Sequence, residues 1–388
     1  MQSGFYIKCL FLLGLSLSIF ETSFAQSNRA WIKFLKKDEL LHKILDQQKT
    51  YQVQILMSEW EDQAHTRLRQ YSWKQENDKY FYPASTVKLP MAVIALEKAN
   101  ELGIGINEKA IFVSNHPEYP SFGEDSIAYA ESTLGKFIEK IFLVSDNDAF
   151  NRLYDFTGRS YFNQRMKALG FDQTEVLHRL SVSLPDAVQN DYPKITFELG
   201  DVMKNDTETT PIRPVLPLGK AYMRNGELVQ EAMDFGRKNV FSLGDQQKFI
   251  QLLFYPQLFP EEKQLKITSE QRVFLQKYMG MYLSETEDGH YDKEWDAYGK
   301  YFIYGAQKGK ADKNLRIYNK IGGAYGFLID NALIRDQVSG KEFFLSAIIF
   351  VNKNQTFNDD TYEYDEIGYP FFAALGKRCL EWSQRKSK

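Results

Sequence analysis

Ser85 and Lys88 are the first residues whose types and spacing could perform chemistry. They stand three positions apart at the expected start of a helix, so both side chains would lie on one helix face. A serine hydroxyl attacks a carbonyl only when a base takes its proton, and a desolvated lysine can be neutral enough to do so. The helix N-terminus would also favour negative charge developing near Ser85. The pair is therefore compatible with a nucleophilic serine activated by a lysine.

This spacing has a simpler explanation, because serine is also a common helix N-cap. The C-terminal segment contains a second copy of the pattern, Ser383 followed by Lys386, to which we assign no function. The pattern gains weight only together with other motifs.

Two further motifs follow along the chain. Ser145, Asp146 and Asn147 stand between two expected helices, where they could also form only an N-cap with an Asx turn. The segment 319–323 precedes a β-rich run, and its glycines, Gly322 and Gly323, would let a ligand approach the strand backbone closely, or would form a simple bulge. Lys320 lies within this segment.

The elements that would position these motifs follow from hydrophobic periodicity. Strands are expected at 51–57, 67–73, 317–318, 325–334 and 342–351, and helices at 30–48, 87–99, 134–143, 147–154, 160–169, 245–254 and 366–382. Strands therefore return only near the end of the chain. Because sequential elements usually pack as neighbours, the two terminal parts should form one α/β layer structure with a helical insertion between them and a cleft at the junction.

This interpretation divides the chain into a signal peptide and two subdomains. Residues 26–82 and 312–388 would form the discontinuous α/β subdomain, and residues 83–311 the helical one. Two segments, about 195–240 and 285–311, are expected to be insertions within the helical part.

The three motifs, in this order and with these flanking elements, resemble those of the penicillin-recognising serine hydrolases, and most closely of the class A β-lactamases. The resemblance covers most of the mature chain. It implies an antiparallel sheet flanked by N- and C-terminal helices, an all-helical subdomain and an active site in the cleft between them.

The resemblance also implies roles for individual residues. Ser85 would be the nucleophile, Lys88 its proton acceptor, and Ser145 a proton shuttle to the leaving nitrogen. Asn147 would bind the substrate's amide, and Lys320 its carboxylate. The backbone N–H groups of Ser85 and Gly323 would form the oxyanion hole, beside Gly322.

Two departures from the family pattern affect the expected activity. Ile321 stands where the family has a hydroxyl residue that contacts the substrate carboxylate. The best sequence match to the family's Glu-Pro pair, whose glutamate activates the deacylating water, is Leu184-Pro185. Whether a neighbouring carboxylate replaces that glutamate stays open; the candidates are Asp186, Asp191 and Glu198. Without a replacement, acylation would proceed and hydrolysis of the acyl-enzyme would be slow.

Composition and the N-terminus indicate the compartment. Lys+Arg number 48 and Asp+Glu 51, a formal net charge of -3, which argues against nucleic acid as a partner. An apolar run too short to span a bilayer, followed by Ser23-Phe24-Ala25, predicts a signal peptide cut after Ala25 and export to a periplasm. We expect no membrane span, no metal, no organic cofactor and a monomer.

The expected function is an exported serine hydrolase with an acyl-enzyme mechanism. Its substrate would be a β-lactam, as in antibiotic resistance, or a peptidoglycan-derived or related amide. One alternative is a penicillin-binding, DD-peptidase-like or esterase-like enzyme with slow deacylation. Another is a binding protein that keeps the fold and cleft but has lost turnover.

Overall fold

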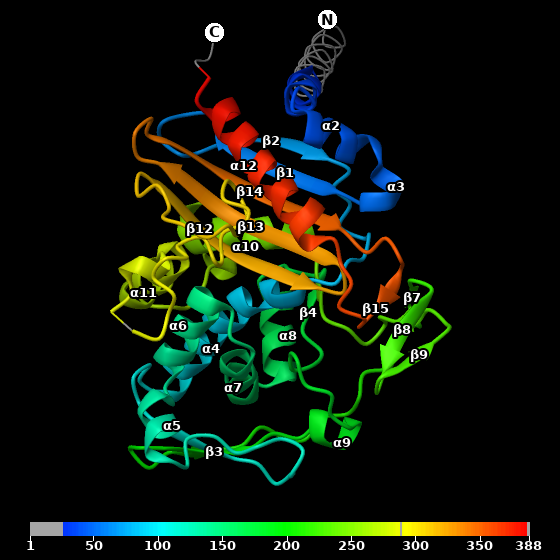
Figure 1. The fold of residues 1–388 in the computed structure, drawn as a ribbon. Helices are drawn as coiled ribbons and strands as arrows, with labels where there is room; N and C mark the ends of the chain where they lie inside the picture. The colour runs from blue at the N-terminus through cyan, green and yellow to red at the C-terminus, as the bar shows by residue number, and fades with distance from the viewer. Residues whose placement is uncertain (1–25, 288, 386–388) are drawn as a thin grey trace, which may run out of the picture.

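The central element of the structure, a computed structural model that describes residues 26–287 and 289–385, is a five-stranded antiparallel sheet (Figure 1). The predicted signal peptide lies outside the described residues. The strand order is β12-β13-β14-β1-β2. The strands are β1 (Gln54–Trp60), β2 (Leu68–Trp73), β12 (Leu315–Ala324), β13 (Phe327–Asp336) and β14 (Lys341–Phe350). The sheet thus joins the two ends of the chain.

Both faces of this sheet are buried. Leu333 and Phe344 face the core that the helical region shares, whereas their neighbours Ile334 and Phe343 belong to the core on the opposite face. Because successive strand residues point to opposite faces, two buried faces require nearly continuous apolar runs. This explains why β13 and β14 were recognisable in the sequence.

The terminal helices cover one face of the sheet and the remaining helices lie on the other side (Figure 1). The first group is a helical segment at 26–35, α2 (Glu39–Asp46), α3 (Gln48–Tyr51) and α12 (Tyr369–Ser383). The second group is α4 (Lys88–Leu102), α5 (Ser126–Glu131), α6 (Leu134–Val144), α7 (Asn147–Thr157), α8 (Arg159–Ala168), α9 (Asp186–Gln189), α10 (Leu243–Phe254) and α11 (Ser269–Gly280). The predicted fold class, an antiparallel sheet with terminal helices and inserted helices, is confirmed.

Helix α4 is the centre of the helical region. Its residues from Lys88 to Ala99 are all buried, which explains its apolar sequence. Pro90 falls in the first turn of α4, where backbone N–H groups have no partner within the helix, so the missing donor costs little.

The N-terminal helix differs from the prediction of one helix over 30–48. The chain leaves the first helical segment after residue 35, and Asp38 begins α2 by accepting a hydrogen bond from the Leu41 backbone N–H at 3.0 Å. The apolar stripe continues through the break, so periodicity alone did not reveal it. An aspartate cap decided the boundary.

Short strands also occur in the middle of the chain, contrary to the expectation that strands return only near the end. They form small sheets away from the central one. Two of these have three strands: β3 (Ala110–Val113), β5 (Lys194–Phe197) and β6 (Val202–Met203) form one, and β8 (Ala221–Arg224) and β9 (Glu227–Val229) form the other with β15 (Thr356–Phe357) from the C-terminal part. The other two are the pairs β4 (Thr174–Glu175) with β11 (Val240–Phe241) and β7 (Pro217–Leu218) with β10 (Met233–Asp234). Strands of two to four residues are too short to give a period. The division at residues 82 and 312 stays a prediction.

Candidate active site

Ser85 lies in a single 3-10 turn, η1 (Ala84–Val87), that leads into α4. The N-cap positions of η1 and α4 are Pro83 and Val87, and neither has a side-chain capping hydrogen bond. The alternative interpretation of Ser85 as an N-cap is therefore wrong. Ala84 adopts a left-handed φ of 47°, an uncommon conformation for a residue with a Cβ. Such local strain is characteristic of functional turns.

Strand β12 passes directly beside this turn, and Gly322 makes the approach possible. A Cβ on Gly322 would lie 2.7 Å from the Pro83 carbonyl oxygen and 3.1 Å from Cγ2 of Thr86. No side chain fits at that separation. The glycine therefore allows the end of β12 to lie against Ser85, which a simple bulge would not explain.

Lys88 is fully buried behind Ser85 and points toward the turn between α6 and α7. Its Nζ donates to the Ser145 carbonyl oxygen, to Asn147 Oδ1 at 2.7 Å and, at 3.4 Å, to the Ser145 hydroxyl. Burial lowers the pKa of Lys88 to about 7, against the opposing charge of Asp146. Within the described residues, no hydrogen bond joins the Ser85 hydroxyl to Lys88.

Ser145 ends α6 with a left-handed φ of 56°, and Asp146 begins α7 by accepting a hydrogen bond from the Ala149 backbone N–H at 2.7 Å. Asp146, rather than Ser145, is thus the cap in this motif. The tight turn leaves the Ser145 and Asn147 side chains free to face the cleft. The Ser145 hydroxyl accepts a hydrogen bond from Lys320 Nζ at 2.8 Å.

Lys320 is the second buried lysine of the site, with 2 % of its surface exposed. Its Nζ also donates to the Ile321 carbonyl oxygen at 3.1 Å. Burial, and next the positive charge of nearby Lys88, hold the pKa of Lys320 well below its usual value. The two amines approach one serine hydroxyl and repel each other when both are charged, so the charge of Lys88 disfavours a proton on Lys320.

Two cavities meet at Ser85. The larger, here the Ser145 cavity, has a volume of about 750 Å³ and the smaller, the Ser181 cavity, about 500 Å³. Ser85, Asn147 and Gly323 line both. Ser145, Ile321 and Gly322 line the larger one. The structure thus brings together all seven predicted site residues: five line the cleft, and Lys88 and Lys320 lie behind it.

The loop that faces Ser85 across the Ser181 cavity contributes Leu180 and Ser181, not the predicted pair Leu184-Pro185. The buried side chain of Asn151 fixes this register: it accepts from the Leu180 N–H at 2.8 Å and donates to the Leu180 carbonyl at 3.1 Å. Asn147 Nδ2 donates to Ser181 Oγ at 2.8 Å. Asn151 lies one helical turn after Asn147, a spacing that could have revealed it.

The three candidate carboxylates lie outside the lining of the two cavities. Asp186 binds Thr210 and Arg237, and Asp191 binds His116, Lys204 and Thr207. Glu198 is exposed after β5.

One wall of the Ser145 cavity contains none of the predicted site residues. The predicted insertion at 285–311 supplies Trp295, Tyr298 and Tyr301, and the start of the C-terminal helical region supplies Asp365 and Tyr369. These residues carry no recognisable motif. A buried anchor holds the insertion on the sheet, because Asp330 accepts hydrogen bonds from the backbone N–H groups of Tyr301 and Phe302, each at 3.1 Å.

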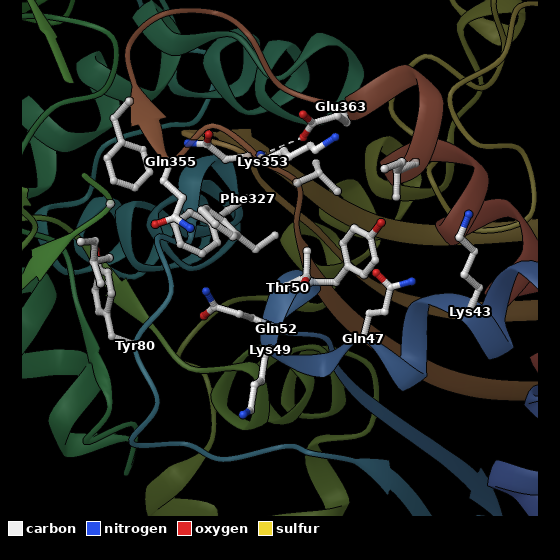
Figure 2. Close-up of a pocket in the computed structure, with 18 residues that line it drawn as sticks. Lys43, Gln47, Lys49, Thr50, Gln52, Tyr80, Phe327, Lys353, Gln355 and Glu363 are labelled. Carbon is white, nitrogen blue, oxygen red and sulfur yellow. Dashed lines mark hydrogen bonds between the residues drawn. The ribbon is translucent and has the colours of Figure 1, made fainter. Parts of the chain in front are cut away.

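A separate cavity of about 890 Å³ lies between α3, β14 and the segment before α12 (Figure 2). Its labelled lining includes Lys43, Lys49, Lys353 and Phe327, and it contains none of the predicted site residues. Residues 26–287 and 289–385 contain no cluster of three or more His, Cys, Asp or Glu side chains that could hold a metal. They also contain no helix with the length and apolar character of a membrane span.

Comparison with solved structures supports the same fold. A β-lactamase from Burkholderia vietnamiensis superposes with a TM-score of 0.54 at 11% identity, covering 92% of this chain and 98% of that one. A β-lactamase from Desulfarculus baarsii gives 0.51 at 16% identity, covering 92% and 97%. The protein PBP-A gives 0.50 at 13% identity, covering 88% and 96%.

No curated protein sequence matches this chain. The model of the beta-lactamase enzyme family matches residues 38–257, more than half of the sequence, including the turn of Ser85 and the turn of Ser145. Together with the fold, this match assigns the protein: the chain belongs to the beta-lactamase enzyme family.

Proposed function

We propose that this protein is an exported serine acyl hydrolase that forms an acyl-enzyme through Ser85. The observation that carries the proposal is the hydrogen-bonded chain from Lys88 through the Ser145 hydroxyl to Lys320, immediately behind Ser85. The lowered pKa of Lys88, about 7, provides a neutral amine at neutral pH. An unprotonated amine near a serine is the base that such chemistry needs.

The proposed acylation moves one proton and exchanges one bond. The Ser85 oxygen bonds to the substrate carbonyl carbon while Lys88 Nζ accepts the hydroxyl proton. The bond from that carbon to the leaving nitrogen or oxygen then breaks, and the leaving atom receives the proton through the Ser145 hydroxyl. The Ser85 and Gly323 N–H groups would bind the oxyanion.

Deacylation is the step that this cleft supports least. It needs a base to activate water. The loop beside Ser85 supplies Leu180 and Ser181, Asp186 and Asp191 bind partners elsewhere, and Glu198 is exposed and lines neither cavity. Asp360, the acidic residue that lines the Ser181 cavity, is exposed to solvent. We therefore propose slow turnover, as in a penicillin-binding, DD-peptidase-like or esterase-like enzyme, rather than efficient β-lactam hydrolysis.

A second candidate, a binding protein without turnover, is favoured by one observation. Lys88 donates its hydrogen bonds to Ser145 and Asn147, and none to the Ser85 hydroxyl. Catalytic hydrogen bonds often form only when substrate is bound, so this geometry does not oppose the enzyme. The two candidates differ in one respect: only the enzyme forms a covalent adduct.

The test is the intact mass of the protein over time with a penicillin and with a neutral fluorophosphonate, for the wild type, Ser85→Ala and Ser383→Ala. Ser383→Ala is the matched control, because Ser383 has the same sequence spacing to a lysine. We expect an adduct that persists in the wild type and the control and is absent from Ser85→Ala. An adduct that clears as product accumulates would indicate efficient turnover. Labelling that survives Ser85→Ala, or none with either reagent, would overturn the enzyme assignment.

A further inference from the structure

The charged side chains that line the two cavities are all acidic. Asp146 and Asp365 line the Ser145 cavity, and Asp360 lines the Ser181 cavity. No lysine, arginine or histidine of the described chain is among the lining residues of either cavity. Asp360 and Asp365 are exposed, so both are hydrated carboxylates at the cleft mouth. A bound carboxylate would meet like charges on both sides of Ser85.

The two buried lysines do not reverse this charge. Lys88 and Lys320 lie behind the cavity lining, and their amines are hydrogen-bonded to protein atoms. Ile321 presents an apolar side chain to the Ser145 cavity, and this side chain offers a carboxylate no hydrogen-bond donor. Among the described residues, the lining therefore offers a carboxylate neither a cationic side chain nor a hydroxyl at position 321.

Aromatic rings line the same wall as Asp365. Trp295 and Tyr298 pack edge to face with ring centroids 5.1 Å apart, and Tyr301 and Tyr369 lie 5.0 Å apart. Tyr298 keeps 37% of its surface exposed. Aromatic faces beside a carboxylate attract ammonium groups through the ring quadrupole and the anionic charge together.

We propose that the preferred substrates are esters or amides that carry an ammonium group, and no carboxylate, on the part that occupies the Ser145 cavity. This inference rests on the proposed acylation of Ser85 and specifies its substrate class. The cation lies between Asp365 and the rings of Tyr369 and Tyr298, and the reacting carbonyl carbon lies at Ser85. Each substrate is thereby selected by charge at one end and by the serine at the other.

The experiment compares three fluorophosphonates that differ only in the tail: ammonium, neutral and carboxylate. Each forms a P–O bond to the serine oxygen as fluoride leaves, so intact mass gives the labelling rate without any deacylation. At low salt we expect the ammonium probe to label Ser85 about tenfold faster than the carboxylate probe, the order of a close charge interaction at a partly exposed site. Added salt should narrow this ratio.

Asp365→Asn should reduce the ratio to about threefold, because one of the attracting charges is removed. The matched control is Glu366→Gln, which removes the same charge from the adjacent exposed residue that lines neither cavity. Equal wild-type rates, a faster carboxylate probe, or the same effect from both variants would overturn the inference while Ser85 labelling still supports the proposed function. No labelling with any probe would overturn both.

Discussion

Buried cationic side chains occur both behind the cleft and in the loop beside it, but those behind the cleft have no hydrogen-bonded carboxylate and the one in the loop has. Lys88 and Lys320 donate to hydroxyl, amide and carbonyl oxygens, and none of their hydrogen bonds goes to a carboxylate. Arg179, which is also fully buried, pairs with Asp155 at 2.8 Å and donates to the carbonyls of Val188, Gln189 and Asp191.

This difference in partners makes Lys88 a candidate base and Arg179 a structural anchor. Burial, only partly offset by the charge of nearby Asp146, lowers the pKa of Lys88 to about 7, so this amine can accept a proton. Burial with Asp155 keeps the guanidinium of Arg179 charged, and its forked donors hold the loop that carries Leu180 and Ser181. Desolvation lowers the pKa of both groups, but the guanidinium starts from a higher pKa and has Asp155 beside it, so it stays charged.

Removing the base should have the largest effect. Lys88→Met keeps the length and removes the amine, so we expect Ser85 labelling by the neutral fluorophosphonate to fall by about 10²- to 10⁴-fold. The matched control is Lys98→Met, because Lys98 is a second buried lysine of α4 that donates to Phe156 and Thr157 away from the cleft. Equal losses in both variants would show that the effect is structural.

Removing the anchor should change stability more than chemistry. Arg179→Met leaves Asp155 without its closest cation and removes the guanidinium donor from three backbone carbonyls, so we expect a loss of about 3 kcal/mol in the free energy of unfolding. Chemical denaturation measures this. Arg237→Met, which breaks the exposed pair with Asp186, should cost about 1 kcal/mol or less. A stable Arg179→Met protein would contradict the anchoring role.

The pH dependence of the labelling rate tests whether Lys88 is the base that accepts the Ser85 proton. Below the Lys88 pKa of about 7, the labelling rate should fall by about tenfold per pH unit, and above it the rate should level off. A rate that is flat from pH 5 to 8 would assign the proton to another group.

Stability should respond to the same pKa in a defined direction. Between about pH 7 and the usual lysine value of 10.5, the unfolded chain holds a proton that folded Lys88 has released, so this contribution stabilises the fold as pH rises. Lys88→Met removes the cost of a buried charge. Its stability gain over the wild type should therefore be largest below pH 7 and should fade toward pH 10.5.

The parts of the fold that were predictable are those with strong local signals. The strands β13 and β14 are buried on both faces, α4 is apolar and buried along most of its length, and α6 and α7 have apolar stripes, so each element is recognisable in the sequence. The break before α2 and the short strands of the middle region depend on one cap or on two to four residues. Periodicity cannot detect features that short.

The residues of the site also fall into those that local sequence motifs predict and those that only long-range contacts place. Ser85, Lys88, Ser145, Asn147 and Lys320 belong to motifs whose spacing is set by one turn or one strand, so their types and order in the sequence were sufficient to nominate them. The match of Leu184-Pro185 to the loop beside Ser85 was wrong, because Asn151 accepts a hydrogen bond from the Leu180 N–H and donates one to the Leu180 carbonyl, which sets the register at Leu180. The sequence signal for this contact is the one-turn spacing of Asn151 from Asn147, which is too common to identify a loop contact.

The sequence by itself determined which side chains could act: a serine, two lysines and a second serine, placed on elements that apolar patterning defines. Only the tertiary structure decided the protonation properties of those side chains and the chemical character of the cleft around them. Their burial without hydrogen-bonded carboxylates lowers the pKa values of the lysines, and segments 295–307 and 365–370 join the end of β12 in lining the cleft with acidic and aromatic groups. Desolvation and electrostatic pairing depend on neighbours distant in the chain, and those neighbours exist only in the folded state.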